Sequence, residues 1–130
     1  MLEPENDRIE YKERLTDNLE REIVAFLNNK EGGEIYIGID DNGEAVGVED
    51  CDALQLIIKD RIKDKICPSV LGLYDIKCVA VDGKQVVKII VASGSEKPYY
   101  LKSKGMSENG CFIRIGSAVQ AMPARMIEEL

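Results

Sequence analysis

The chain has no histidine among its 130 residues, and this absence limits the chemistry that it can perform. It excludes Ser-His-Asp and Cys-His catalysis, in which an imidazole moves the proton. It also excludes the imidazole ligands that most catalytic zinc sites use. Proton transfer in this protein therefore falls to carboxylates, lysine, tyrosine or cysteine.

The cysteines are the next candidates for chemistry. They are Cys51, Cys67, Cys78 and Cys111. Their spacings of 16, 11 and 33 residues contain no C-x-x-C pair, and no histidine completes a structural zinc site. We expect reduced core thiols; the alternatives are a disulfide or a redox site. Unpaired cysteines, and an N-terminus without the apolar segment of a signal peptide, indicate a reducing cytoplasm.

Lysines, arginines and tyrosines in the second half of the chain could bind a nucleic acid. The cations around its Gly/Ser-rich loop are Lys97, Lys102, Lys104, Arg114 and Arg125. Several such charges would give salt-sensitive binding to phosphates that does not depend on base sequence. Arg114 alternates with Ile113 and Ile115, so we expect it to point away from the core if those two are buried. Tyr99 and Tyr100 could stack on an unpaired base.

The net charge of -7 is unevenly distributed along the chain. Residues 1–50 hold 15 acids and 5 bases, a balance of -10, whereas residues 51–130 hold 9 acids and 12 bases, a balance of +3. The total charge alone argues against a polyanion partner, but the acidity belongs to one segment. Cations between residues 59 and 65 alternate with aspartates, which is typical of a solvated helix face.

A phosphate-binding nucleotide loop is missing from the sequence. No G-x-x-x-x-G-K-[ST] segment occurs, and Gly32-Gly33 precedes a predicted strand rather than a helix. ATP hydrolysis by a P-loop is therefore excluded.

The elements that must position these residues mix helices and strands without strict βαβ order. Apolar stripes predict helices at 19–27, 52–65 and 124–130. Alternating β-branched runs predict strands at 34–39, 45–48, 76–81, 85–92, 99–101 and 111–115. Asn42-Gly43 and Asp82-Gly83 predict two hairpin turns. We expect an α+β fold in which a mixed sheet with hairpins packs against two main helices and a short C-terminal helix.

Four blocks of the sequence, taken together, resemble a known family. They are Glu5–Lys12 (ENDRIEYK), Ile23–Asn28 (IVAFLN), Gly32–Gly47 (GGEIYIGIDDNGEAVG), and Pro98-Tyr-Tyr with Phe112–Ser117 (FIRIGS). In this order they resemble the Schlafen AlbA_2 domain, also known as divergent AAA-4. The resemblance implies an AlbA-like nucleic-acid-binding domain at the N-terminus of a transcriptional regulator or helicase-related protein. We therefore expect residues 1–130 to be one such domain of a longer chain.

The resemblance also implies a carboxylate site. In RNA-cleaving Schlafen proteins, two glutamates five residues apart and an aspartate after the Gly-Gly strand bind a divalent metal. Glu5 and Glu10 match that spacing, and Asp40 or Asp41 matches the third position. Three carboxylates would suit Mg²⁺ or Mn²⁺, which could activate water for phosphodiester cleavage. Lys12 could neutralise charge on the phosphate. The alternative is that these carboxylates are solvated or belong to a turn.

Three functions are compatible with these patterns. We expect a cytoplasmic module of a transcriptional regulator that binds DNA or structured RNA through its phosphates. The alternatives are a metal-dependent endoribonuclease and an oligomerisation module that pairs with a second copy. No window reaches the roughly 18 consecutive apolar residues of a membrane span, so we expect no membrane partner.

Overall fold

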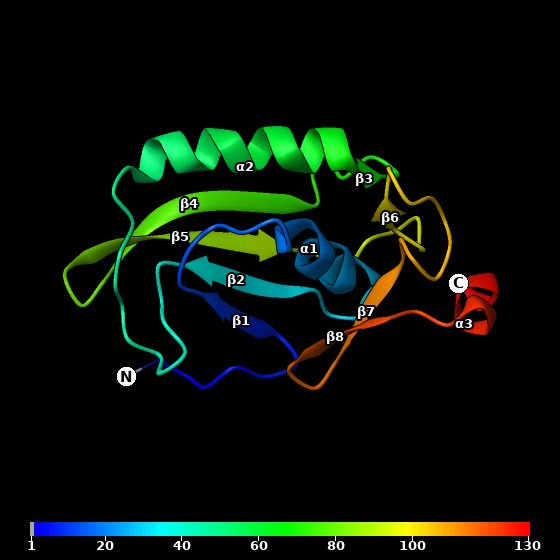
Figure 1. The fold of residues 1–130 in the computed structure, drawn as a ribbon, viewed down its shortest axis with the longest axis horizontal. Helices are drawn as coiled ribbons and strands as arrows, with labels where there is room; N and C mark the ends of the chain where they lie inside the picture. The colour runs from blue at the N-terminus through cyan, green and yellow to red at the C-terminus, as the bar shows by residue number, and fades with distance from the viewer. Residues whose placement is uncertain (1) are drawn as a thin grey trace.

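The structure is a computed structural model that describes residues 2–130. In chain order its elements are β1 (Ile9–Lys12), α1 (Leu19–Asn28), β2 (Gly33–Ile37), α2 (Cys51–Lys65), β3 (Ile66–Cys67), β4 (Tyr74–Val81), β5 (Lys84–Val91), β6 (Tyr100–Leu101), β7 (Phe112–Ile115), β8 (Ala118–Ala121) and α3 (Ala124–Glu129). The predicted α+β class is confirmed (Figure 1). No helix within residues 2–130 has both the length and the apolar character needed to cross a bilayer.

The main sheet has four strands in the order β1-β2-β5-β4. β1 runs parallel to β2, and the other neighbours are antiparallel. The β4–β5 hairpin confirms the turn predicted at Asp82-Gly83, whose φ angles of 50° and 79° are those that a tight hairpin turn of this kind requires. Two small ribbons, β3–β6 and β7–β8, lie toward the right end of the molecule in Figure 1.

Both main helices pack on one face of this sheet. Ile35 and Ile37 of β2 and Val87 and Ile89 of β5 point to that face and are completely buried, as is Phe26 of α1. Each apolar side chain of this size stabilises the fold by roughly 1.5–3 kcal/mol when buried. The apolar stripe on α1 and the alternation along β2 and β5 therefore form the core that the sequence pattern predicts.

Two glycines allow the chain to return from α1 into β2. Gly32 has a φ of 68°, and a Cβ atom there would lie 2.1 Å from the Val91 carbonyl oxygen. A Cβ atom on Gly33 would lie 2.2 Å from the Phe26 ring. A larger residue at Gly32 would collide with the β5 backbone, and one at Gly33 would collide with α1, so both positions require glycine.

The register of β1 sends two charged side chains to the helix-covered face. Glu10 pairs with Ile35 and Lys12 pairs with Ile37, so the charged and apolar partners lie on the same side of the sheet. Tyr11, between them, points to the opposite face. Charged groups thus enter the edge of the core, close to α1.

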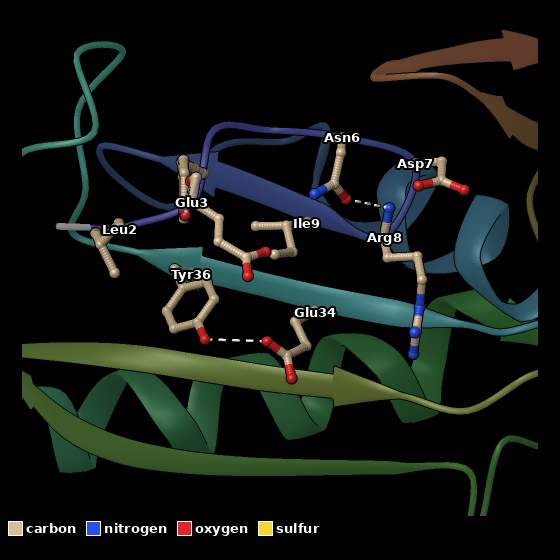
Figure 2. A pocket seen from close by; sticks show the side chains of 9 residues that line it. Leu2, Glu3, Asn6, Asp7, Arg8, Ile9, Glu34 and Tyr36 are labelled. Carbon is tan, nitrogen blue, oxygen red and sulfur yellow. Dashed lines mark hydrogen bonds between the residues drawn. The ribbon is translucent and has the colours of Figure 1, made fainter.

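The opposite face of the sheet is crossed by residues 2–8, which we call the N-terminal arm. Figure 2 shows the hollow beside it. The Tyr11 hydroxyl donates to the Glu3 carbonyl and anchors the arm. The Tyr36 hydroxyl donates to Glu34 Oε1 at 3.0 Å, and Lys88 Nζ lies 3.7 Å from Glu34 Oε2. The hollow measures about 550 Å³, and its charged lining is Glu3, Asp7, Arg8 and Glu34. Acids outnumber the single cation, which disfavours an anionic ligand there.

The structure departs from the predicted strands in two ways. β1, β3 and β8 were not predicted, because strands of two to four residues carry too little alternation to be distinguished from loops. The strand predicted at 45–48 is wrong, because only a single bridge joins Ile39 to Ala45. Gly47, with a φ of 79°, bends the chain toward α2 instead of continuing the hairpin.

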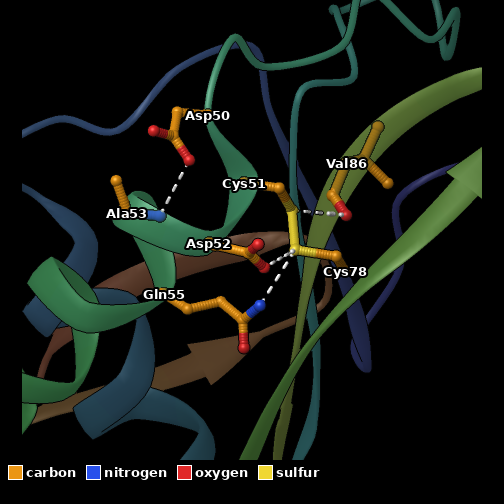
Figure 3. Close-up of a disulfide and its surroundings, with 7 residues drawn as sticks. All are labelled: Asp50, Cys51, Asp52, Ala53, Gln55, Cys78 and Val86. Atoms are coloured by element: carbon orange, nitrogen blue, oxygen red, sulfur yellow. Dashed lines mark hydrogen bonds between the residues drawn. A yellow bond between two sulfur atoms is a disulfide. The ribbon is translucent and has the colours of Figure 1, made fainter.

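Two of the four cysteines form a disulfide, so the expectation of reduced thiols is wrong for Cys51 and Cys78 (Figure 3). Asp50 caps the start of α2 by accepting the Ala53 N–H at 3.0 Å, which places Cys51 in the first turn. Packing of α2 across β4 then brings the Cα atoms of the two cysteines to 6.1 Å. Cys67 and Cys111 are free. Spacing along the chain could not reveal this contact, which depends on how the helix crosses the sheet.

The disulfide links residues that are 27 positions apart. A disulfide that closes a loop of this length stabilises a domain by about 3–4 kcal/mol, because it restricts the unfolded chain. We therefore expect Cys51→Ser/Cys78→Ser to lower the free energy of unfolding by this amount in urea titrations under oxidising conditions. Dithiothreitol should lower the wild-type value equally and leave the double variant unchanged. The matched control is Cys67→Ser, and a dithiothreitol effect that persists in the double variant would contradict the assignment.

Candidate functional site

A buried arginine lies at the centre of the charged cluster beside α1. The Arg114 side chain is fully buried, and its Nη1 donates to Glu10 Oε1 at 2.6 Å. Its Nη2 donates to the carbonyl oxygens of Asn6 and Ile9 at 2.8 and 2.9 Å. The guanidinium also stacks over the Phe26 ring, 4.9 Å from the ring centre. A desolvated cation with this many partners is fixed in place, which is characteristic of a structural group or of the floor of a site.

The prediction that Arg114 points away from the core is therefore wrong. Phe112 and Arg114 face inward, whereas Ile113 is half-buried and Ile115 is 54% exposed. Alternation along a strand separates two faces but does not say which one is covered. Here the inward face meets α1, where carboxylates compensate the guanidinium.

Glu22 of α1 completes the cluster. Its Oε1 accepts from Lys12 Nζ at 2.8 Å, and its Oε2 lies 3.6 Å from Arg114 Nη1. Among the described residues, this buried Oε2 atom has no hydrogen-bond donor. Lys12 is thus held by Glu22, and its Nζ is also 4.0 Å from Glu10 Oε2. The predicted phosphate-neutralising lysine is part of an internal ion network.

Glu5 and Glu10 lie together, as the family resemblance implies. Burial and the hydrogen bond with Glu5 raise the pKa of Glu10 to about 8, with Glu22 adding to the effect and Arg114 opposing it. For Glu5, burial opposes the change, but the hydrogen bond with Glu10, the Tyr11 N–H at 2.9 Å and nearby cations hold its pKa below the ordinary value. Two adjacent carboxyls therefore titrate far apart and share one proton near neutral pH.

The two aspartates of the predicted site serve the loop after β2. Asp40 Oδ1 accepts the backbone N–H groups of Asn42 and Glu44, both at 2.9 Å, and so fixes a turn. Asp41 is exposed and shares a second hollow, of about 620 Å³, with Glu5. Across residues 2–130, no group of three or more Cys, Asp or Glu side chains is arranged to hold a metal ion. Glu5, Glu10 and Asp40 in this arrangement do not fit the Mg²⁺ or Mn²⁺ site that the resemblance implies.

The predicted base-stacking residues differ in accessibility. Tyr99 is completely buried, and its hydroxyl accepts the Glu96 N–H at 3.2 Å, so its assignment to base stacking is wrong. Tyr100 and Lys97 are half-buried. Lys102 and Lys104 are exposed, as predicted for cations that contact phosphates.

Strand pairing brings three lysines together at the end of α2. The Lys102 N–H donates to the Lys65 carbonyl at 2.9 Å, because β6 pairs with β3 directly after α2. The surface, which we call the lysine surface, comprises Lys65, Lys102 and Lys104. Lys65 lies 3.6 Å from Glu20, and its side chain remains 58% exposed. Within residues 2–130, no acidic oxygen lies within 4.0 Å of the ammonium groups of Lys102 and Lys104.

Sequence reasoning missed two residues that organise the site, Glu22 and Asn28. The Asn28 amide nitrogen donates to the carbonyls of Tyr99 and Phe112 at 3.1 and 2.9 Å, and its oxygen accepts the Tyr99 N–H at 2.7 Å. It thereby joins the end of α1 to β6 and β7. The only available signal for Glu22 was its spacing, three residues after Leu19 and four before Phe26, which puts it on the apolar stripe of α1.

Comparison with known proteins places this geometry in a family. Residues 5–123 match the Schlafen, AlbA_2 family, and the chain therefore belongs to it. No curated protein matches the sequence.

Two solved structures share the fold. The DIP2311 protein from Corynebacterium diphtheriae is 23% identical with a TM-score of 0.66, over 89% of this chain and 22% of that chain. The N-terminal domain of a RecG-related protein from Nitrosomonas europaea is 23% identical with a TM-score of 0.61, over 88% of this chain and 81% of that chain. The chain thus spans about a fifth of the DIP2311 protein.

The raised pKa of Glu10 predicts a specific pH dependence of stability. The Glu10 carboxyl has a pKa of about 8 in the folded protein and 4.5 in the unfolded chain, so between these values the folded state holds the extra proton. Its contribution to stability is therefore full below pH 4.5 and is lost as the pH rises to about 8. Glu5, with a lowered pKa, has the opposite effect, but below pH 4.5. We expect the wild type to lose about 1–2 kcal/mol more than Glu10→Gln between pH 5 and 8, a value reduced for solvent screening at the rim of the site.

Urea titrations across this pH range measure the difference. Glu13→Gln, which alters an exposed carboxylate of the same segment, is the matched control and should follow the wild type. Parallel curves for the wild type and Glu10→Gln would contradict the shared proton.

Proposed function

We propose that this domain binds nucleic acid through the phosphate backbone at the lysine surface. The observation that carries the proposal is that Lys102 and Lys104 lie beside the end of α2, are exposed, and have no acidic oxygen within 4.0 Å among residues 2–130. Cations in such positions replace the counterions of a phosphate chain and give binding that ignores base sequence. Membership of the AlbA_2 family, and a fold shared with the N-terminal domain of a protein named as related to the ATP-dependent DNA helicase RecG, support the same function.

The role within the cell follows from the same considerations. We assign the domain to a transcriptional regulator or helicase-related protein, in which it holds DNA or structured RNA for its neighbours. Part of the acidity of the N-terminal segment is internal, because Glu22 contacts Lys12 and Arg114 within the charged cluster. Repulsion of a polyanion depends on the charges near its binding surface, so the total of -7 does not measure the repulsion at the lysine surface.

Removing two lysines tests the proposal. We expect Lys102→Gln/Lys104→Gln to weaken binding of a labelled duplex and of labelled tRNA by about tenfold at 50 mM salt, because each lysine contributes one phosphate contact. The slope of log affinity against log salt, measured by fluorescence anisotropy between about 50 and 200 mM, should fall by about one for each lysine removed.

The matched control is Lys30→Gln/Lys84→Gln, which removes the same charge from exposed positions outside the lysine surface. This variant should retain the wild-type affinity and slope to within about twofold. Equal losses in the two double variants would show that only net charge matters and would contradict binding at the lysine surface. A wild type that binds neither probe at about 50 mM salt would overturn the proposal as a whole.

A second candidate function is cleavage of RNA phosphodiesters at the Glu5–Glu10 pair. One observation favours it: the two carboxyls have pKa values displaced in opposite directions, Glu10 to about 8. Near neutral pH, Glu10 then holds a proton that it can donate to a leaving oxygen, whereas Glu5 is a carboxylate that can accept one. Glu10 also lines a small hollow of about 230 Å³ between α1 and the β7–β8 turn, through which a phosphate could approach.

Incubation of tRNA with and without added Mn²⁺ tests this activity. We expect fragments from the wild type, and a rate lower by about 100-fold in Glu5→Gln and in Glu10→Gln, the loss typical of removing a general acid or base. Glu128→Gln, an exposed carboxylate of α3, is the control and should cleave as the wild type does. Intact tRNA under both conditions would exclude the nuclease.

A further inference from the structure

A hollow between α2 and the segment leading into β4 has no part in the charged cluster. It measures about 460 Å³ and is lined by Lys59, Asp60, Lys63, Ile66, Cys67, Ser69, Val70, Leu71 and Tyr74. We call it the α2 hollow. It adjoins the lysine surface in sequence, because Ile66 of its lining follows Lys65 directly.

Apolar groups form the interior of the α2 hollow. Ile66 and Val70 are buried and provide its floor, and the half-buried Tyr74 contributes an aromatic ring. Leu71 is 90% exposed, more than any other large apolar side chain of residues 2–130. An exposed leucine that adjoins an apolar hollow marks a surface that a ligand can cover.

Charged groups are placed around this interior rather than within it. Lys59 and Lys63 lie one helical turn apart on α2, so both ammonium groups reach the same side of the hollow. Asp60 also lines it and repels a phosphate from the interior. The arrangement therefore suits a ligand with a neutral, flat, apolar part inside and anionic groups on the lysine side.

We infer that the α2 hollow takes an unpaired base of a single-stranded nucleic acid, with the adjoining phosphates on Lys59 and Lys63. This inference rests on the proposed function and refines its substrate class from any phosphate chain to one with accessible bases. The backbone hydrogen bond of 2.9 Å from the Lys102 N–H to the Lys65 carbonyl brings further cations to the end of α2 beside the hollow. A base stacked on an aromatic ring binds with little regard to sequence, since every base has a π face. The bases of a duplex are already stacked and would not enter.

The experiment compares a labelled 12-residue oligothymidylate with a labelled hairpin duplex by fluorescence anisotropy at about 50 mM salt. Loss of a stacking or apolar contact should weaken oligothymidylate binding by about tenfold in Leu71→Ala and in Tyr74→Leu, and should change duplex binding by less than twofold. Leu71→Ala keeps the test valid if Tyr74→Leu unfolds, because Leu71 is outside the core. Leu56→Ala, which shortens a 64% exposed leucine of α2 outside the hollow, is the matched control and should bind both probes normally.

The outcomes separate this inference from the proposed function. Unchanged oligothymidylate affinity in Leu71→Ala, with loss of both probes in Lys102→Gln/Lys104→Gln, would overturn the base-binding hollow and leave phosphate binding standing. A wild type that binds neither probe would remove both. Binding of a labelled polyglutamate peptide as tightly as oligothymidylate, with a matching loss in Leu71→Ala, would assign the hollow to an acidic protein partner and overturn the inference.

Discussion

The burial of Arg114 is the constraint on which the rest of the structure depends. Its guanidinium is removed from water, and this is tolerated only because Glu10, Glu22 and the carbonyls of the N-terminal arm surround it. Removing one partner from a buried ion pair typically costs about 3–5 kcal/mol, since the other charge is left without compensation. The network therefore fixes three elements in relation to one another: β1, α1 and β7, of which the first and last are about a hundred residues apart in sequence. Asn28 joins α1 to β6 and β7 by a second, uncharged set of bonds.

This constraint divides the charges of the protein into two groups. Of the acids near the N-terminus that enter the core, Glu22 is matched by Lys12 and Arg114, and Glu10 keeps its proton to near pH 8. The cations of the lysine surface have few acidic neighbours and remain available to solvent. The protein thus has an internally compensated charged cluster in one place and an open basic surface in another. Only the open surface suits a polyanion.

Helix α2 connects the fold to that surface. Its start is held by the Asp50 cap and the Cys51–Cys78 disulfide, and its middle by the buried Ile58 and Ile62. Its end leads directly into β3, whose pairing with β6 brings the Lys102 segment alongside. A shift of α2 across β4 would therefore move the lysines and reshape the α2 hollow together. Stability and the candidate binding surface depend on the same packing.

The sequence by itself determined the α+β class, the two main helices, the β4–β5 hairpin and the family, because each is encoded in local periodicity, turn residues or an ordered set of blocks. The family resemblance also implied that Glu5 and Glu10 are neighbouring carboxyls. Only the tertiary structure decided which face of β7 is buried, and so reversed the expected direction of Arg114. It alone also showed that Tyr99, just before β6, is buried. It also decided that Cys51 meets Cys78, that Asp40 serves a turn, and that Glu22 compensates Arg114. The reason is physical: alternation defines two faces without naming the covered one, and contacts between distant segments depend on how helices cross the sheet.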